Sequence, residues 1–508
     1  MTLPERLDLW LNPILVKELR QAVRGRFAVS ILVLALLAQV LAVGILLLFE
    51  NLTGSNASVA GRETFLTLII IVVTPCIFFI PIYAGFRMAS ERNDSNVDLL
   101  FITTIRARTI VAGKLASTFA VVALIFSSSL PFIAFAYALR GIDLLMIVMV
   151  FAAAMLVVLS VAILALFVAA LPATKPFKLL IGLGAFVLTL VFYIPSMAFV
   201  AQGLSGSARS PFGASTWSVA GTFFGLLVTA DIILLVLTTV MITPPAANRA
   251  LPVRILLSVL WALTFVGALA LAHDNQRIGP LVAWAVVQFV LATLVLASAI
   301  GEREAWGPRV ARTIPVAPFR RALAFLFYSG GAGGTLWASL LFAVTVVAFN
   351  VSAALIPAVD GTRVERLTRD LLEAALCMIA YALSGLLIRR RAFRGRIPPR
   401  ATWAVATALL VVIAVIPPVL FLVRYHETQV FSDYFYLAAL GNPAPVPGYA
   451  RGGPVRLIVL LLWCAAVAAA NRDWFAGQLQ RFHPPTRKDG SGDADSELPV
   501  LQSELTPE

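Results

Sequence analysis

The chain has 508 residues, of which 60% are hydrophobic and only 13% are charged. No soluble domain buries that much apolar surface, so the composition excludes a soluble protein and indicates one that crosses a membrane repeatedly. The apolar runs are continuous rather than alternating, which predicts an all-α, polytopic transmembrane helical bundle instead of a barrel. The net charge of +13 fits Lys and Arg in cytoplasmic loops, and we expect no nucleic acid as a partner.

A short amphipathic segment precedes the first apolar run and reads Asn-Pro-Ile-Leu-Val-Lys-Glu-Leu-Arg over residues 12–20. Asn12 can cap a helix that has Pro13 at its first position. Its apolar residues recur at helical spacing, and the polar ones, which include Lys17, Glu18 and Arg20, cover most of the remaining surface. We expect an interfacial helix whose basic face meets anionic lipid or a cytosolic partner. A positive flank that only orients the first span is the alternative.

Twelve long apolar runs follow this segment. They lie near residues 28–49, 65–89, 115–138, 144–171, 179–202, 217–241, 255–273, 280–300, 333–356, 371–389, 401–423 and 455–470. With a cytoplasmic N-terminus, the loops on that side hold 29 of the 39 Lys and Arg residues, and the opposite side holds ten. This asymmetry predicts an even number of spans with both termini in the cytoplasm.

These runs divide the chain into four parts. The interfacial helix occupies residues 1–27, a first six-span region residues 28–242, a second six-span region residues 243–470, and a cytoplasmic tail residues 471–508. From about residue 484 the tail is rich in Pro, Asp, Glu and Ser, which predicts disorder. No extramembrane segment approaches the size of a catalytic domain.

The loop after the second span, residues 91–114, combines a charged patch, a short apolar run and a basic turn. Its residues of interest are Glu91, Arg92, Asp98, Leu99, Leu100, Arg106, Arg108 and Lys114. A short helix here would expose apolar side chains at the cytosolic face, where another protein could take them into a groove. An ordinary interfacial helix in the loop is the alternative reading.

Together, the 12–20 segment, the first span and the 91–114 loop resemble the permease subunit of type-2 ATP-binding-cassette (ABC) transporters. The usual wording of that family's loop is similar to E-x-E-x-G-T-x-E-x-L-L-x-T-P-L-S-x-x-x-I-x-x-G-K. The chain agrees at Asp98-Leu99-Leu100, Thr103, Ile110 and Gly113-Lys114. It departs at Ser95-Asn96, where the family has Gly-Thr, and at Thr104 and Arg106, where the family has Pro and Ser.

The resemblance implies an elbow helix at residues 12–20 and a coupling helix in the 91–114 loop that seats on a separate ATPase subunit. ATP and Mg would then bind that partner, and this chain would need no cofactor of its own. In agreement, the only Gly-Lys pair, Gly113-Lys114, has Arg108 and Leu115 where a phosphate-binding loop needs Gly and Ser or Thr. The resemblance further implies export across a bacterial-type cytoplasmic (inner) membrane, and no enzymatic activity in this chain.

Permeases of this family usually have six spans, and two subunits form the pathway, so twelve spans require an explanation. Either two six-span halves are fused in one chain, or a six-span core carries six accessory spans and assembles as a homodimer or with a second permease. A twelve-span secondary transporter and an integral-membrane enzyme are alternatives to the ABC reading. Only Asp231 lies near the middle of a span, where it would serve a proton or substrate site, or would make a polar contact between helices.

Overall fold

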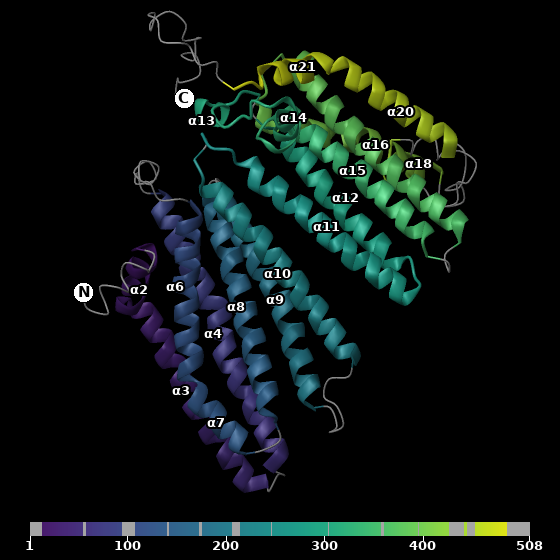
Figure 1. Cartoon of the computed structure of the whole chain (residues 1–508). Coiled ribbons are helices and arrows are strands. Elements are labelled where there is room, and N and C mark those ends of the chain that lie inside the picture. The colour runs from purple at the N-terminus through teal and green to yellow at the C-terminus, as the bar shows by residue number, and fades with distance from the viewer. Residues whose placement is uncertain are drawn as a thin grey trace, which may run out of the picture. The chain divides into compact units, whose positions relative to one another are not determined.

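The structure is a computed structural model of the chain. It describes residues 13–53, 57–93, 107–139, 142–171, 175–205, 214–244, 246–302, 304–356, 360–394, 396–425, 441–443 and 453–484. All regular secondary structure in these ranges is helical, which confirms the all-α fold (Figure 1). The chain divides into two compact units, residues 1–245 and 246–508.

The first unit is a bundle of long helices with two short ones, of which one is the N-terminal helix (Figure 1). Its helices are α2 (Pro13–Arg24), α3 (Arg26–Thr53), α4 (Ala57–Asn93), α6 (Ala107–Ser128), α7 (Leu130–Ala138), α8 (Leu144–Ala170), α9 (Lys175–Ser205) and α10 (Ala214–Ile242). The core lies between α3, α4, α6 and α8, where Val72, Ile125 and Val158 are buried together. Gly85 allows α4 and α8 to approach, because a Cβ there would lie 3.3 Å from the carbonyl oxygen of Ala165.

The second unit also combines long spans with short helices. Its helices are α11 (Ala250–Asn275), α12 (Gly279–Ala299), α13 (Pro308–Ala311), α14 (Pro318–Phe327), α15 (Gly331–Ala354), α16 (Gly361–Arg391), α17 (Thr402–Leu410), α18 (Ile416–Tyr425), α20 (Gly453–Ala470) and α21 (Arg472–Arg481), with the 3-10 turn η1 (Pro399–Ala401) and the π turn η2 (Val411–Val415). Helix α15 packs against α12 and α16, and α16 also packs against α17 and α20. Gly385 of α16 meets Ala406 of α17 so closely that a Cβ on the glycine would lie 2.8 Å from the Cα of the alanine.

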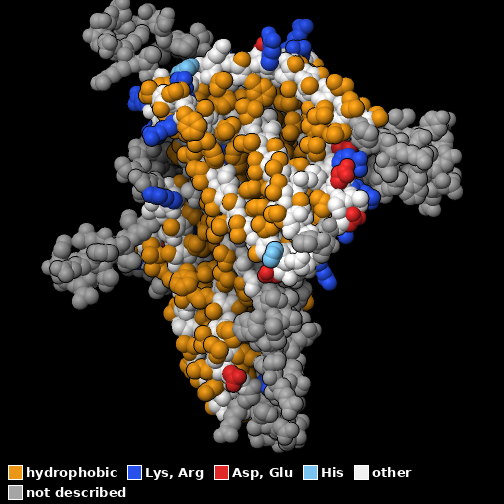
Figure 2. Space-filling model, turned by 45° about the vertical axis from the view of Figure 1, so that its right-hand side comes forward, with side chains coloured by type: hydrophobic (Ala, Val, Ile, Leu, Met, Phe, Trp, Pro, Cys, Tyr) orange, Lys and Arg blue, Asp and Glu red, His pale blue; other side chains and the backbone are white. Residues whose placement is uncertain are grey.

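The described residues contain ten helices, counting joined segments as one, that are long and apolar enough to cross a membrane. The pair α20–α21, bent by 50°, would make an eleventh. All twelve predicted runs lie on helices, but the described apolar part of α9, Pro176–Val191, is shorter than the run predicted there. Large apolar side chains such as Leu37, Leu294 and Leu462 are more than half exposed, as expected for surfaces that face lipid. On the face shown in Figure 2, apolar side chains cover most of the described helices, and the charged side chains in view lie mostly at its edges. The chain is therefore a multi-pass membrane protein.

Candidate functional site at the N-terminal helix

The helix α2 packs against the start of α6 and also contacts α3. Pro13 is its first residue, as predicted, and the side chains of Lys17 and Arg20 are exposed. Glu18 differs from the expected polar face, since it is buried one turn before the buried Ala22. The face that α2 turns toward the bundle therefore includes a carboxylate, which needs charged or hydrogen-bonding partners there.

Two cations from different helices supply those partners. Oε1 of Glu18 lies 3.0 Å from Nζ of Lys114 on α6, and Oε2 lies 2.9 Å from Nη2 of Arg87 on α4. The side chains of Glu18 and Lys114 are each only 5% exposed, whereas that of Arg87 is 20% exposed. We call these three residues the Glu18 cluster. Because losing one partner of a buried ion pair leaves an uncompensated charge, the cluster fixes α2 to the ends of two spans.

Arg87 extends the connection to a fourth helix. Its guanidinium donates to the hydroxyl of Tyr83 at 3.3 Å and also contacts Oε1 of Gln21 on α2. The same guanidinium lies 5.5 Å from the centre of the Tyr83 ring, and that ring stacks on Phe27 of α3 at 4.8 Å between centroids. Helices α2, α3, α4 and α6 thus meet at one set of side-chain contacts.

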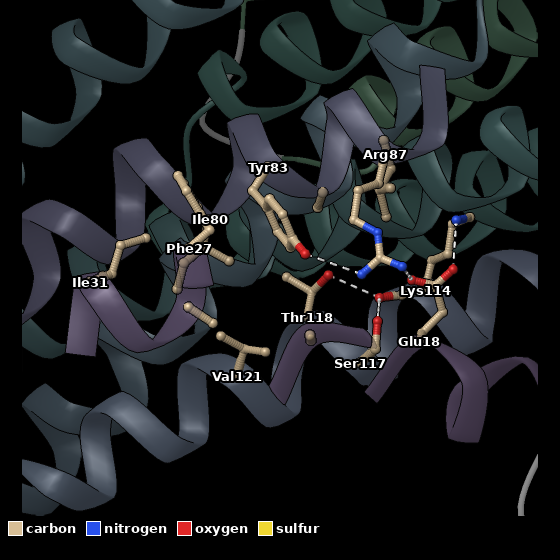
Figure 3. Close-up of a pocket in the computed structure, with 14 residues that line it drawn as sticks. Glu18, Phe27, Ile31, Ile80, Tyr83, Arg87, Lys114, Ser117, Thr118 and Val121 are labelled. Atoms are coloured by element: carbon tan, nitrogen blue, oxygen red, sulfur yellow. Dashed lines mark hydrogen bonds and ion pairs between the residues drawn. The ribbon is translucent and has the colours of Figure 1, made fainter. Parts of the chain in front are cut away.

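A pocket opens beside the Glu18 cluster, between α2, α3, α4, α6 and α8. Figure 3 shows the charged residues Glu18, Arg87 and Lys114 at one end of it and Ile31, Phe27 and Ile80 toward the other. The hydroxyls of Ser117 and Thr118 line the pocket but donate to the carbonyl oxygen of Lys114, at 2.8 and 2.9 Å. In the part of the chain that the structure describes, no group of three or more His, Cys, Asp and Glu side chains could hold a metal ion.

The predicted docking loop borders this site. Glu91 and Arg92 belong to the last turn of α4, although their side chains are not among those described, and Arg108 is exposed on the first turn of α6. Lys114 is buried against Glu18 instead of lying on the surface. Five of the predicted residues lie outside the described residues: Asn12, Asp98, Leu99, Leu100 and Arg106.

Asp231 lies elsewhere in the first unit. It is buried on α10 and accepts a hydrogen bond from the hydroxyl of Ser160 on α8 at 2.6 Å. The same hydroxyl is 3.0 Å from the carbonyl oxygen of Leu156. This geometry corresponds to the polar contact between helices that the sequence offered as one of two readings of Asp231.

The second unit holds a buried ion pair that sequence reasoning did not single out. Arg254 of α11 is 2% exposed, and its Nη2 lies 2.6 Å from Oε1 of Glu302. Its Nη1 donates to the carbonyl oxygens of Leu326 at 2.9 Å and Tyr328 at 2.6 Å, at the end of α14. Oε2 of Glu302 accepts from the N–H of Gly330 at 2.6 Å. Burial raises the pKa of the Glu302 carboxyl above its ordinary value, although Arg254 and the Gly330 N–H act in the opposite direction.

This pair holds the glycine-rich start of α15, which we define as Gly330, Gly331, Gly333 and Gly334. A Cβ on Gly331 would lie 2.8 Å from the Trp474 ring, and one on Gly333 would overlap the carbonyl oxygen of Phe325. Around it, Phe482 packs against Trp306 and Phe325 with centroids 4.9 and 5.4 Å apart. Glycine is required here because backbone and rings approach so closely.

A further buried pair, Glu373 of α16 and Arg456 of α20, has a separation of 3.3 Å. Sequence reasoning missed Arg87, Arg254, Glu302 and both members of this pair as partners. The three arginines enter only the topology count of Lys and Arg, with Arg87 and Arg254 on the cytoplasmic side and Arg456 on the opposite side. Comparisons with protein-family models, with curated proteins and with solved structures give no match. The site is therefore interpreted from its own geometry.

Proposed function

We propose that this chain is the membrane-spanning permease subunit of an ABC transporter, and that a separate ATPase subunit docks on its 91–114 loop. The observation that carries the proposal is the Glu18 cluster. It joins the N-terminal helix to the end of α4 and the start of α6, the two helices that border the loop. The resemblance of the loop to a coupling helix supports the same reading.

The cluster would make the N-terminal helix respond to the docked partner. A displacement of the loop moves the adjoining ends of α4 and α6, and Arg87 and Lys114 move with them. Because both cations bind Glu18, α2 has to follow or the buried ion pairs break. Lys114 and Arg87 act in this scheme as positioning residues, while Asp98, Leu99 and Leu100 make the contact with the ATPase.

The resemblance to ABC permeases adds the energy source, the direction of transport and the membrane. ATP and Mg bind the partner, the substrate is exported, and the protein lies in a bacterial-type cytoplasmic membrane with both termini in the cytoplasm. The pathway needs two permease regions, supplied by the two units of one chain, by a homodimer or by a second permease. The ten or eleven apolar helices support a multi-pass membrane subunit of this size.

The docking role can be tested by co-purification. The full chain is expressed in its native host, and the amount of Walker-motif ATPase captured per permease is measured by mass spectrometry after mild detergent extraction. Leu99→Asp with Leu100→Asp places two charges in the apolar run, so we expect capture of the ATPase to fall by about tenfold or more.

Val316→Asp with Phe319→Asp is the matched control. These two residues are about four-fifths exposed, Val316 just before α14 and Phe319 in its first turn. The predicted topology places them on the same face of the membrane as the 91–114 loop. The control should capture as much ATPase as the natural sequence. Equal capture by all three chains, each inserted and monodisperse, would refute docking through the 91–114 loop.

A further inference from the structure

The pocket beside the Glu18 cluster has a gradient of polarity. Most of its lining is apolar, with Phe27, Ile31, Ile80, Val121 and Leu166 among the larger side chains. Charged groups line one end only, and Figure 3 shows them there, grouped around the carboxylate of Glu18. A ligand that uses the whole pocket therefore has one charged end and one apolar end.

The gradient runs along the two apolar spans that carry Arg87 and Lys114. Arg87 and Lys114 lie close to those ends of the spans Gly61–Ser90 and Ala107–Ala138 that adjoin the docking loop. Ile80 and Val121 lie seven residues further into the same spans, which corresponds to about 10 Å along a helix. A phospholipid has the same arrangement, because its headgroup lies at the membrane boundary and its acyl chains point inward.

The charged end favours an anion. Two cations, Arg87 and Lys114, face one carboxylate in the Glu18 cluster. Arg87 is its most exposed member, and its contacts with Glu18, Gln21 and Tyr83 use three of the five N–H donors of a guanidinium. Two donors remain for phosphate oxygens, which guanidinium groups bind well.

We propose that this pocket binds an anionic phospholipid of the surrounding membrane, with the headgroup phosphate at Arg87 and one acyl chain between Ile31, Ile80 and Val121. A free phosphate would gain nothing from the apolar lining, and a neutral hydrocarbon would gain nothing from Arg87. The bound lipid wedges between α2 and the spans that hold it. The inference stands on the pocket alone and does not require the proposed function.

The test uses the full chain in lipid nanodiscs. Two photoactivatable lipids with identical acyl chains are compared, one with a phosphatidylglycerol headgroup and one with a phosphatidylcholine headgroup. Cross-linked peptides are mapped by mass spectrometry. We expect labelling of α3, α4 and α6 residues around the pocket, with the anionic lipid favoured by about fivefold.

Two variants separate the headgroup from the acyl chain. Arg87→Gln should abolish the preference for the anionic lipid while labelling at the apolar end persists. Ala28→Leu fills the lining beside Phe27 and should reduce labelling by both lipids. Ala152→Leu, at an exposed position of α8 away from the pocket, adds the same volume and should change neither.

Three outcomes would overturn the proposal. Labelling spread evenly over the lipid-facing helices would mean that the pocket holds no lipid. Equal labelling by both lipids in the natural chain would mean that it holds a neutral chain only. Unchanged labelling in both Arg87→Gln and Ala28→Leu, with both variants folded by thermal unfolding, would place the lipid elsewhere.

Discussion

The helices α2 and α14 are both short and amphipathic and both lead into a long apolar helix, yet buried charges hold them in different ways. In the first unit the carboxylate lies on the amphipathic helix itself, and the spans α4 and α6 supply the cations. In the second unit neither charge belongs to α14. Arg254 binds carbonyl oxygens at its end, and Glu302 holds the N–H of Gly330.

The two sites differ in how tightly other side chains pack around the buried charges. Arg254 and Glu302 form a neutral pair, and the aromatic rings of Trp306, Phe325 and Phe482 pack next to the glycine-rich start of α15. The Glu18 cluster includes the partly exposed Arg87 and has a pocket beside it. We infer that the second region is a fixed structural joint and that the first is adjustable, because a pocket lies beside the first and its Arg87 is partly exposed.

The largest expected loss of stability is in the second unit, at the fixed joint formed by Arg254, Glu302 and the glycine-rich start of α15. Gly333→Ala would place a methyl group on the carbonyl oxygen of Phe325, and a backbone group cannot rotate away. We expect a loss of about 4 kcal/mol in unfolding free energy, measured by thermal unfolding in detergent. Gly182→Ala on α9 meets no atom within 4 Å and should not destabilise the protein. Similar unfolding of both variants would contradict the fixed joint.

The second largest loss of stability is expected from a change to the Glu302 carboxylate of that joint. Glu302→Gln replaces one oxygen by an amide nitrogen, so a donor faces either Arg254 or the Gly330 N–H. Arg254 then has no countercharge while it is 2% exposed, and we expect a loss of about 3 kcal/mol. The unfolding midpoint measures this change. A midpoint equal to that of the natural chain would show that Arg254 needs only the carbonyl oxygens.

A smaller effect is expected in the adjustable region. Glu18→Gln should cost about 2 kcal/mol, less than Glu302→Gln, because the partly exposed Arg87 can turn toward water. The double variant Glu18→Gln with Lys114→Met removes the buried lysine charge as well and should recover about half of that loss. A double-mutant cycle on the unfolding midpoint measures the coupling, and additive losses would show that Glu18 and Lys114 do not form a pair.

The smallest effect concerns an exposed carboxylate in the second unit. Asp360 caps α16 by accepting from the N–H of Thr362 at 3.0 Å, and hydrogen bonds from Thr362 lower the pKa of Asp360. A lowered pKa means that the stabilisation is present above the ordinary Asp pKa and is lost as the pH falls through the lowered value. Asp360→Ala should therefore lower the unfolding midpoint slightly at neutral pH, and the difference should shrink in acid. A difference that grows in acid would contradict the cap.

Much of the fold could be predicted from the sequence because hydropathy is a local property. Each predicted apolar run lies on a helix, and Pro13 begins α2 as its position before the apolar pattern indicates. The number of spans differs from the prediction, whereas the all-α class does not. α9 and the bent pair α20–α21 separate the twelve predicted runs from the ten helices counted as spans.

The site could be predicted only in part. The sequence indicated that α2 is amphipathic, but nothing local distinguishes a buried Glu18 from the exposed Lys17 beside it. In the sequence Arg87 contributes only to the excess of Lys and Arg near the 91–114 loop, although in the structure it belongs to the Glu18 cluster. Pairings of this kind depend on which helix ends meet in space, and a single sequence gives no periodic signal for that.

The pairing of Glu18 with Lys114 also has a consequence for biogenesis. The two residues are 96 positions apart, and α3 and α4 lie between them. During synthesis α2 therefore reaches the membrane long before its buried lysine exists. Helix α2 therefore remains at the membrane interface without this partner until α3 and α4 have been inserted and the start of α6 has been synthesised. Closure of this ion pair joins α2 to α6, and α8, α9 and α10 of the first unit are added only afterwards.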